Sequence, residues 1–329
     1  MGRYAAIKNN FNTLRRVNNV FTAWFGNNLY ICDILTKNRT TFYINYMRHY
    51  IKREVRNDVA EFLSAPEKYV EKFKKERRYD FKEKTPIWVC WFQGKENMPE
   101  IVRACFENLI NQIDFNVAEL VLITEDNFSN YIEIDPCIIK KRKEGLLSYT
   151  NLSDLLRVKL LATYGGLWID ATVFVTQPIT KNFLERSFYS PKTLCEPDVR
   201  IYVSQCRWAT WLMLSNDNML FPFVAHVMNA YYIRANGLMD YFFMDYVIEL
   251  AYENIDQVKH LLDELEFSNS YGTSLANQFN EPYNKDSFEK IYTSTQFIKL
   301  SYKMKASLTT VDGQLTNYGY LRKEILGLK

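Results

Sequence analysis

The residues best suited to chemistry lie between positions 153 and 172, where the chain reads SDLLRVKLLATYGGLWIDAT. Leucines recur there at helical spacing, so Asp154 and Arg157 share one face of a predicted helix. The glycine pair 165–166 predicts the end of that helix, and residues 167–169 predict a short buried strand ending at Asp170, with a strand resuming at 173–175. Because open α/β sheets bind ligands at the carboxyl ends of strands, the pattern predicts a ligand site with two acids and one base. The alternative for the helical pair is an ordinary surface ion pair.

The elements that must position these residues alternate along the chain. Residues 87–91 and 119–124 predict buried strands, with an amphipathic helix between them over 100–113, and residues 220–265 return to helical spacing. Residues 4–78 lack strand alternation and predict several helices, with Phe62, Tyr69, Val70 and Phe73 on an apolar face. We therefore expect an α/β fold in which helices flank a mostly parallel sheet. The predicted division is a basic helical region over 1–84 and a domain over 85–329 that carries the site and has a helical C-terminal part.

Composition excludes several classes of protein. The 329 residues are 16% aromatic with only 11 glycines and 9 prolines, which is typical of a globular chain. The three histidines have no partner at ligand spacing, so neither a histidine-based metal site nor a Ser-His-Asp triad is expected. No G-x-G-x-x-G follows the first strand, which disfavours a dinucleotide-binding oxidoreductase. The six cysteines form no C-x-x-C pair, which favours a reduced cytosolic setting, and neither an apolar leader nor an 18-residue apolar run predicts export or a membrane span.

The segment 153–172 resembles the DxD region of the sugar-binding-motif glycosyltransferases, in particular the capsular polysaccharide synthesis branch of glycosyltransferase family 32. Four further blocks resemble that family in the same order, and the resemblance covers about residues 85 to 305. They are TPIWVCWFQG at 85–94, MPEIV at 98–102, MDYFF at 239–243 and FIKLSYK at 297–303. Any block alone is a weak signal, but five in order are hard to produce by chance.

The resemblance implies a single Rossmann-like domain of the glycosyltransferase A type. It implies a retaining enzyme that transfers a hexose, galactose or glucose, from a UDP-sugar. The implied acceptor is a lipid-linked oligosaccharide on undecaprenyl diphosphate, used in capsule or exopolysaccharide assembly and joined by an α-linkage.

The resemblance also implies roles for residues near the first strand and the predicted helix. Trp91 and Phe92 are assigned to the nucleotide, with Trp91 stacking on the uracil; the alternative is that Trp91 packs in the core. Asp154 and Arg157 are assigned to the sugar hydroxyls, with Arg157 also near the phosphates, because a guanidinium offers several donors in a fixed fork.

Asp170 is the strongest single prediction. The resemblance assigns it to catalysis and, together with Thr172, to a divalent cation, Mn²⁺ or Mg²⁺, that offsets the charge of the departing diphosphate. A strict DxD motif has a second acid where this chain has Thr172. This departure is common in the capsular branch, but it weakens the metal prediction.

Two later blocks supply the remaining candidates. Lys299, Tyr302 and Lys303 stand at helix-like spacing and are predicted to clamp the diphosphate, and Ile298 stands where family members often have a histidine. Asp240 is predicted to face the acceptor or the reacting sugar carbon. The alternative for Asp240 is an acid at a helix start, favoured by the helix dipole.

Charge is unevenly distributed along the chain. Residues 1–84 hold 18 lysines and arginines against 9 acids, a net +9, while the remainder carries 23 against 29, a net −6. The densest basic run contains Lys72, Lys74, Lys75, Arg77 and Arg78. We expect this region to hold a cytoplasmic enzyme peripherally on the anionic inner face of the cell membrane. The alternative is a solvated helix face and linker.

Two other functions remain open from the sequence. One is a toxin-like glucosyltransferase that modifies protein side chains. The other is a non-catalytic, membrane-bound assembly partner whose donor site has degenerated at Thr172 and Ile298. No nucleic-acid partner is expected.

Overall fold

A five-stranded sheet forms the centre of the molecule. The computed structural model describes residues 7–8, 10–12, 14–15, 20–35, 42–193, 203–216 and 218–328. The strands are β1 (Thr85–Cys90), β2 (Ala118–Ile123), β3 (Gly166–Ile169), β5 (Phe188–Tyr189) and β6 (Leu212–Ser215), in the order β2-β1-β3-β6-β5. β2 and β3 both run parallel to β1, and β6 is antiparallel to both β3 and β5. The predicted mostly parallel sheet is therefore confirmed, with β6 reversed.

A second, two-stranded sheet lies beside the first. β4 (Val173–Val175) pairs antiparallel with β7 (Phe297–Lys299), and the register places Val173 opposite Lys299. This pairing brings the chain that follows Asp170 next to a segment more than 100 residues away. It is the main long-range contact that shapes the site.

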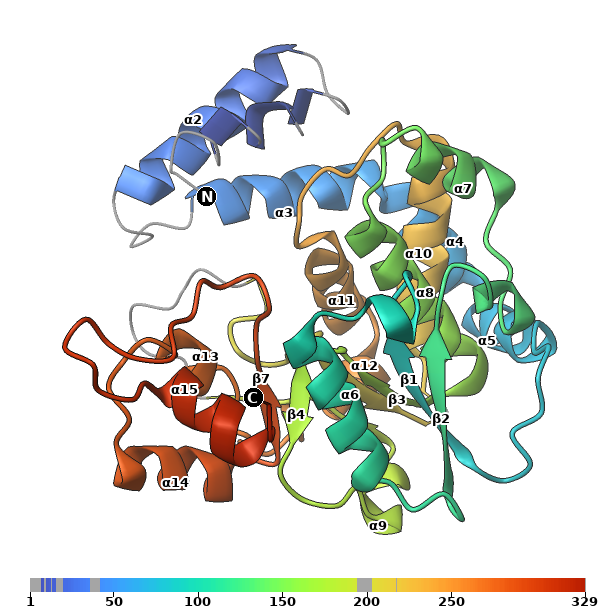
Figure 1. The fold of residues 1–329 in the computed structure, drawn as a ribbon. Coiled ribbons are helices and arrows are strands. Elements are labelled where there is room, and N and C mark those ends of the chain that lie inside the picture. Colours follow the sequence, from blue (N-terminus) through green and yellow to red (C-terminus); the bar gives the residue numbers. More distant parts are fainter. Residues whose placement is uncertain are drawn as a thin grey trace.

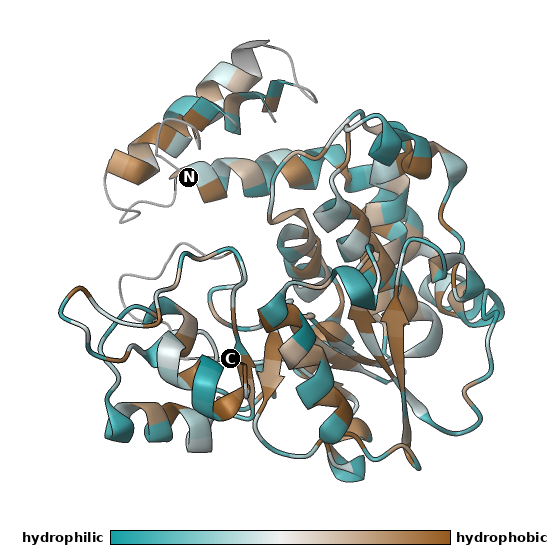
Figure 2. Ribbon diagram, viewed as in Figure 1, coloured by the Kyte–Doolittle hydropathy of each residue, from teal (hydrophilic) through white to brown (hydrophobic). Residues whose placement is uncertain are grey.

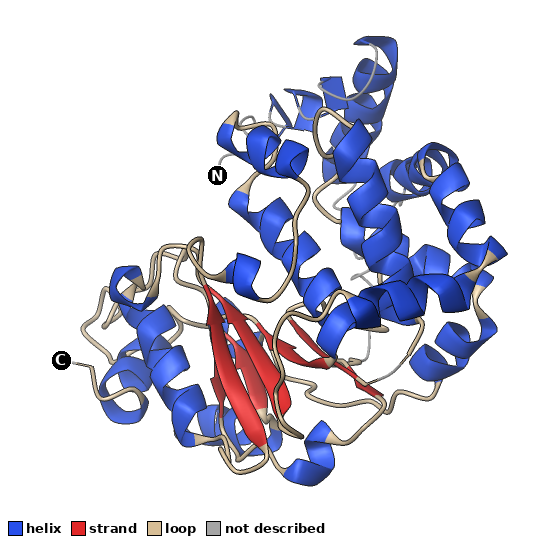
Figure 3. Cartoon of the chain, turned by 90° about the vertical axis from the view of Figure 1, so that its right-hand side faces the viewer, coloured by secondary structure: helices blue, strands red, loops and turns tan. Residues whose placement is uncertain are grey.

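Helices cover both faces of the central sheet (Figures 1 and 3). The helices of the described residues, not all of which touch this sheet, are α2 (Val20–Leu35), α3 (Phe42–Glu54), α4 (Arg56–Ser64), α5 (Pro66–Lys75), α6 (Glu100–Asn111), α7 (Pro136–Lys143), α8 (Tyr149–Tyr164), α9 (Lys181–Leu184), α10 (Leu220–Arg234), α11 (Phe243–Asn254), α12 (Asp256–Asp263), α13 (Ser274–Asn277), α14 (Lys285–Ser294) and α15 (Asn317–Tyr320). Short helical turns are η1 (Lys95–Asn97), η2 (Phe128–Asn130) and the π-type η3 (Leu321–Ile325).

The alternation of side chains along the strands divides the core into two layers. Trp88 and Trp168 point to the face covered by α8 and α10. Ile87, Val89 and Leu167 point to the opposite face, where they pack with residues of α6 and α9. Figure 2 shows the central strands as the most hydrophobic elements, as expected for strands buried on both faces.

The N-terminal helices share a core with the rest of the molecule. Phe62, Tyr69 and Phe73 are buried in the same cluster as α8, α10 and α11, which confirms the predicted apolar face of these helices. The Arg234 guanidinium of α10 also pairs with Asp58 of α4, at 2.5 Å. The division at residue 84 stays a prediction.

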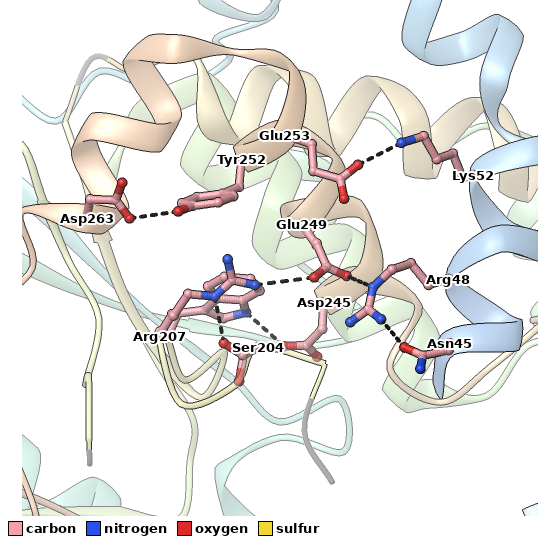
Figure 4. Close-up of polar contacts among 11 residues, drawn as sticks. Asn45, Arg48, Lys52, Ser204, Arg207, Asp245, Glu249, Tyr252, Glu253 and Asp263 are labelled. Atoms are coloured by element: carbon pink, nitrogen blue, oxygen red, sulfur yellow. Dashed lines mark hydrogen bonds and ion pairs between the residues drawn. The ribbon is translucent and has the colours of Figure 1, made fainter. Parts of the chain in front are cut away.

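A polar network, here called the α3–α11 network, joins α3 to α11 and to the segment 203–208 (Figure 4). Glu249 accepts from Arg48 at 2.7 Å and from Arg207 at 3.3 Å. Asp245, one turn before Glu249, accepts from the Trp208 indole at 2.9 Å. The network therefore ties three segments that are distant in sequence.

Two expectations concern membranes and cysteines. Within the described ranges, no helix has the length and apolarity needed to cross a membrane.

The cysteines differ in their state. Cys90, Cys105 and Cys137 are free thiols, but Cys206 is disulfide-bonded, so the expectation of a fully reduced set is wrong for that residue. Cys195 lies outside the described residues.

Candidate functional site

A cavity of about 570 Å³ opens where β1 and β3 end. Its wall is built by the residues after these strands, the first turns of α8, the turn after β3 and the chain that follows β7. Nine of the ten predicted site residues line it: Trp91, Phe92, Asp154, Arg157, Asp170, Thr172, Lys299, Tyr302 and Lys303. The structure thus brings together positions spread over more than 200 residues of sequence.

The glycine turn before β3 is needed for this arrangement. Gly165 and Gly166 have φ of +72° and +88°, a region that other residues rarely adopt. A Cβ on Gly166 would lie 2.2 Å from the Pro86 carbonyl oxygen, and one on Gly165 would lie 2.7 Å from that of Ser215. Glycine at both positions therefore lets β3 lie close to β1 and β6, which fixes where Asp170 emerges.

Arg157 is the central group of the site. Its Nη2 lies 3.3 Å from Asp154 Oδ1 and 3.2 Å from Asp170 Oδ1, while Nη1 donates to the Thr210 carbonyl at 2.7 Å. The guanidinium also lies over the Trp168 ring, 4.9 Å from its centre. These contacts engage both terminal nitrogens and fix the orientation of the guanidinium, while its buried Nε has no hydrogen-bond partner among the described residues.

Asp170 receives donors on both carboxylate oxygens. Besides Arg157, Oδ1 accepts from the Trp168 indole at 2.9 Å, and Oδ2 accepts from Lys299 Nζ at 2.6 Å. Burial alone would raise the pKa of Asp170, but the charges of Lys299 and Arg157 outweigh it and hold the pKa below its usual value. Asp170 is therefore ionised at neutral pH.

Asp154 behaves differently although it touches the same arginine. Burial raises its pKa to about 6; the Arg157 charge offsets part of that rise and the Asp170 charge adds to it. The two carboxylates thus have pKa values shifted in opposite directions, a pattern that frequently marks functional sites.

Aromatic side chains form another part of the wall. The Trp91 ring meets Tyr302 edge to face with centroids 5.5 Å apart, and its indole donates to the Asn97 carbonyl at 3.3 Å. Trp88, by contrast, is fully buried and donates to the Gly165 carbonyl. Trp91 lines the cavity, whereas Trp88 does not. Phe92 is buried against Tyr149, with ring centroids 4.9 Å apart.

The predicted helix-like spacing of Lys299, Tyr302 and Lys303 is wrong. Lys299 ends strand β7, and the other two residues lie in the loop that follows. Pairing of β7 with β4 favours an extended backbone there, and Leu300 N–H donates to the Thr172 carbonyl at 2.8 Å. Lys299 is thereby held beside the Asp170–Thr172 turn.

The structure does not bring Asp240 into the cavity lining. Its carboxylate is buried, accepting from the Tyr43 hydroxyl of α3 and from the Phe242 N–H, each at 2.8 Å. Asp240 lies three residues before α11 begins, and the acid in the first turn of that helix is Asp245, so the alternative of an acid at a helix start does not describe Asp240 either. The adjacent Tyr241 lines the cavity instead and is 70% exposed. Sequence reasoning missed Tyr241, although it lies in the same MDYFF block.

The residues of the cavity fit a divalent cation poorly. Both Asp170 oxygens already accept from nitrogen donors, and Thr172 offers a neutral hydroxyl where a second acid would stand. Across the part of the chain that the structure describes, no cluster of three or more His, Cys, Asp or Glu could hold a metal. Mg²⁺ and Mn²⁺ sites are usually rich in carboxylates, so Asp170 alone is a weak ligand set.

Comparisons with known proteins bear on identity. A family model described as capsular polysaccharide synthesis protein matches residues 35–317. An O-glycosyltransferase, braB of Annulohypoxylon truncatum, is 30% identical over 96 residues, which cover 27% of this chain and 23% of that protein. No solved structure matches. Because the family model spans most of its length, the chain belongs to the capsular polysaccharide synthesis protein family.

Proposed function

We propose that this protein is a glycosyltransferase that transfers a hexose, glucose or galactose, from a UDP-sugar to a lipid-linked oligosaccharide in capsule or exopolysaccharide assembly. The observation that carries the proposal is the chain of contacts from Asp154 through Arg157 and Asp170 to Lys299 in one cavity. Family membership and the O-glycosyltransferase relative support sugar transfer. The GT-A fold, the retaining outcome, the α-linkage and the undecaprenyl diphosphate acceptor rest on the sequence resemblance and are part of the proposal.

The proposed donor pose follows from the groups in the wall. The uracil stacks on Trp91, whose ring is already oriented by Tyr302 and the Asn97 carbonyl. The diphosphate lies toward Lys299 and Lys303, and the hexose lies toward Asp154, whose carboxylate accepts from sugar hydroxyls. Arg157 sits between the two acids and holds both carboxylates in position.

The transfer step exchanges one bond at the sugar. The bond from C1 to the β-phosphate oxygen breaks, and its electron pair leaves with UDP. The acceptor hydroxyl oxygen forms the new bond to C1 on the same face, and its proton passes to the departing phosphate oxygen. Cations fixed before the reaction stabilise the charge that develops on the phosphate, an effect that usually supplies much of the rate enhancement.

A non-catalytic assembly partner is the second candidate. The observation that favours it is the replacement of two expected polar groups: Ile298 is 1% exposed in the core, and Thr172 replaces an acid. A toxin-like glucosyltransferase would have the same cavity but a protein acceptor, and no observation favours it.

Donor binding and hydrolysis separate these candidates. Purified protein is heated with UDP-, GDP- or CDP-sugars, since a ligand that binds only the native state raises the melting temperature with concentration. We expect a shift with UDP-glucose or UDP-galactose only, and slow release of UDP without acceptor. A protein that binds these donors but never releases UDP, even with membrane extracts as acceptor, would instead be the assembly partner.

We also propose that the basic N-terminal region places the enzyme peripherally on an anionic inner membrane surface. Lys72, Lys75, Arg77 and Arg78 are exposed, although Lys72 pairs with Glu76 and Arg78 with Glu133. Each cation near such a surface contributes about 1 kcal/mol. Co-sedimentation with anionic vesicles should fall from 0.1 M to 1 M salt; equal binding to neutral vesicles would contradict the proposal.

A further inference from the structure

We propose that Lys299, assisted by Lys303 and Arg157, supplies the positive charge for the departing diphosphate in place of a divalent cation. The inference rests on the proposed function and deepens it, because it concerns the same cavity. It departs from the metal predicted from the sequence. Its basis is the donor set and the charge balance of the cavity wall.

Strand pairing sets the position of Lys299. Strand β7 places Lys299 opposite Val173, one residue beyond Thr172. The backbone N–H of Lys299 donates to the Gly272 carbonyl. Its ammonium group reaches Asp170, the first position of the motif, at 2.6 Å. The single acid of the motif is therefore already paired with a cation from the neighbouring strand.

The described residues of the cavity wall carry more positive than negative charges. Two acids, Asp154 and Asp170, face three cations, Arg157, Lys299 and Lys303. The wall therefore carries a positive surplus even with both acids ionised. A divalent cation at Asp170 would have to displace Lys299, whose Nζ lies 2.6 Å from Oδ2, or sit against its charge. A diphosphate, in contrast, adds the negative charge that this surplus favours.

Asp170 positions two cations at once. Asp170 holds Lys299 on one oxygen and Arg157 on the other, so the two cations are fixed before the donor arrives. Cations that need no reorganisation stabilise developing charge most effectively. Asp170 is then a residue that orients cations, in addition to any contact with the donor.

The test compares UDP with uridine, with and without metal. Wild-type protein treated with EDTA and dialysed is titrated with UDP by calorimetry, and UDP-glucose hydrolysis is measured in parallel, each before and after addition of Mn²⁺ or Mg²⁺. We expect the UDP affinity and the hydrolysis rate each to change by less than about threefold when the metal is added. Chelation that abolishes UDP binding or hydrolysis, with recovery of more than tenfold on adding Mn²⁺, would overturn the inference and leave the proposed function intact.

Substitution of single lysines shows which side chain supplies the positive charge for the diphosphate. Lys299→Met should lower the affinity for UDP at least tenfold and keep the affinity for uridine within twofold of wild type. Lys303→Met should lower the affinity for UDP by a smaller factor. Lys181→Met is the matched control, because Lys181 is an exposed surface lysine paired with Glu185. Equal loss of UDP and uridine affinity in Lys299→Met would overturn the inference. Absence of UDP binding to the wild type under every condition would overturn the proposed function and this inference with it.

Discussion

Two partly buried clusters of charged side chains, here called the two arrays, have opposite arrangements of charge. In the cavity cluster, which comprises Asp154, Arg157, Asp170 and Lys299, an arginine lies between two acids. In the α3–α11 network an acid, Glu249, lies between two arginines, Arg48 and Arg207. Distances within the two arrays are similar, so local geometry alone does not say which is functional.

The difference lies in what surrounds each array. The cavity cluster lines a space of about 570 Å³ together with aromatic rings and a further lysine. The α3–α11 network instead joins three segments of the chain, with Glu249 7% exposed between them. Charged groups that line a cavity are thus candidates for function, whereas charged groups enclosed between elements of the chain are candidates for a role in stability.

Asp170→Asn is the variant expected to have the largest effect. Loss of its charge frees Lys299 and Arg157 from their fixed positions, so turnover should fall by about 100-fold or more. The melting temperature should change less than in the Glu249 variant described next. Steady-state hydrolysis of UDP-sugar and thermal unfolding measure the two effects. Turnover near that of the wild type would remove Asp170 from the site.

Glu249→Gln should produce the opposite pattern. It leaves the Arg48 and Arg207 guanidiniums without their shared counter-charge, and we expect a loss of about 2 to 4 kcal/mol in unfolding free energy. UDP affinity should stay within twofold. Denaturant unfolding and calorimetry measure the two quantities.

The same helix offers a matched control, Glu253→Gln. Glu253 pairs with Lys52 at 2.9 Å, but both side chains are exposed, so its loss should cost under about 1 kcal/mol. A Glu249 variant as stable as the Glu253 variant would show that the network does not hold α3 in place.

Part of this comparison could be predicted from the sequence. The turn at Gly165–Gly166, the strand ending at Asp170 and the helix with Asp154 and Arg157 are local, so residue spacing was sufficient to find them. The contact between Lys299 and Asp170 spans 129 positions, and nothing in local spacing encodes it.

The errors have physical causes as well. Spacings of three and four suit a helix, but pairing of β7 with β4 makes Lys299 part of a strand, and tertiary contacts outweigh so short a pattern. The prediction for Asp240 rests on its place in a block that resembles the family, yet its oxygens accept from the Tyr43 hydroxyl and the Phe242 N–H, and the neighbouring Tyr241 lines the cavity. Which of two neighbours faces a cavity depends on the backbone at the helix start.

Trp91→Ala tests the aromatic part of the cavity. Stacking of a base on an aromatic ring contributes about 1 to 3 kcal/mol, so UDP affinity should fall about 5- to 150-fold. Turnover at saturating donor should change less, because stacking acts on the ground state and the transition state alike. Trp91→Phe keeps a ring and should retain most of the affinity. Unchanged affinity in Trp91→Ala would mean that the indole does not contact the nucleotide.

The smallest expected effect is a pH dependence that separates the two arrays. Burial raises the pKa of Asp154 to about 6, and an ionised carboxylate accepts from sugar hydroxyls more strongly than a protonated one. Affinity for UDP-glucose should therefore rise up to about tenfold per pH unit below 6 and level off above it. Calorimetry from pH 5 to 8 measures this, and Asp154→Asn should remove the dependence. A wild-type affinity that is flat across this range would mean that Asp154 does not bind the sugar as a carboxylate.

Asp245 in the α3–α11 network is the counterpart for stability. Burial raises its pKa to about 7, the Trp208 hydrogen bond lowers it in part, and the Asp154 charge raises it further. The native state therefore holds this proton up to a higher pH than the unfolded chain, whose aspartates titrate near 3.9. This contribution to stability is complete below about pH 4 and is lost as the pH rises toward 7. Asp245→Asn keeps an acceptor for Trp208 and should reduce the loss of stability with rising pH. Donor affinity in this variant should still rise with pH near 6. The midpoint of that rise should move only slightly, because the charges of Asp154 and Asp245 interact. Loss of the rise in donor affinity in Asp245→Asn would show that the two arrays act as one titrating unit, and the distinction between them would fail.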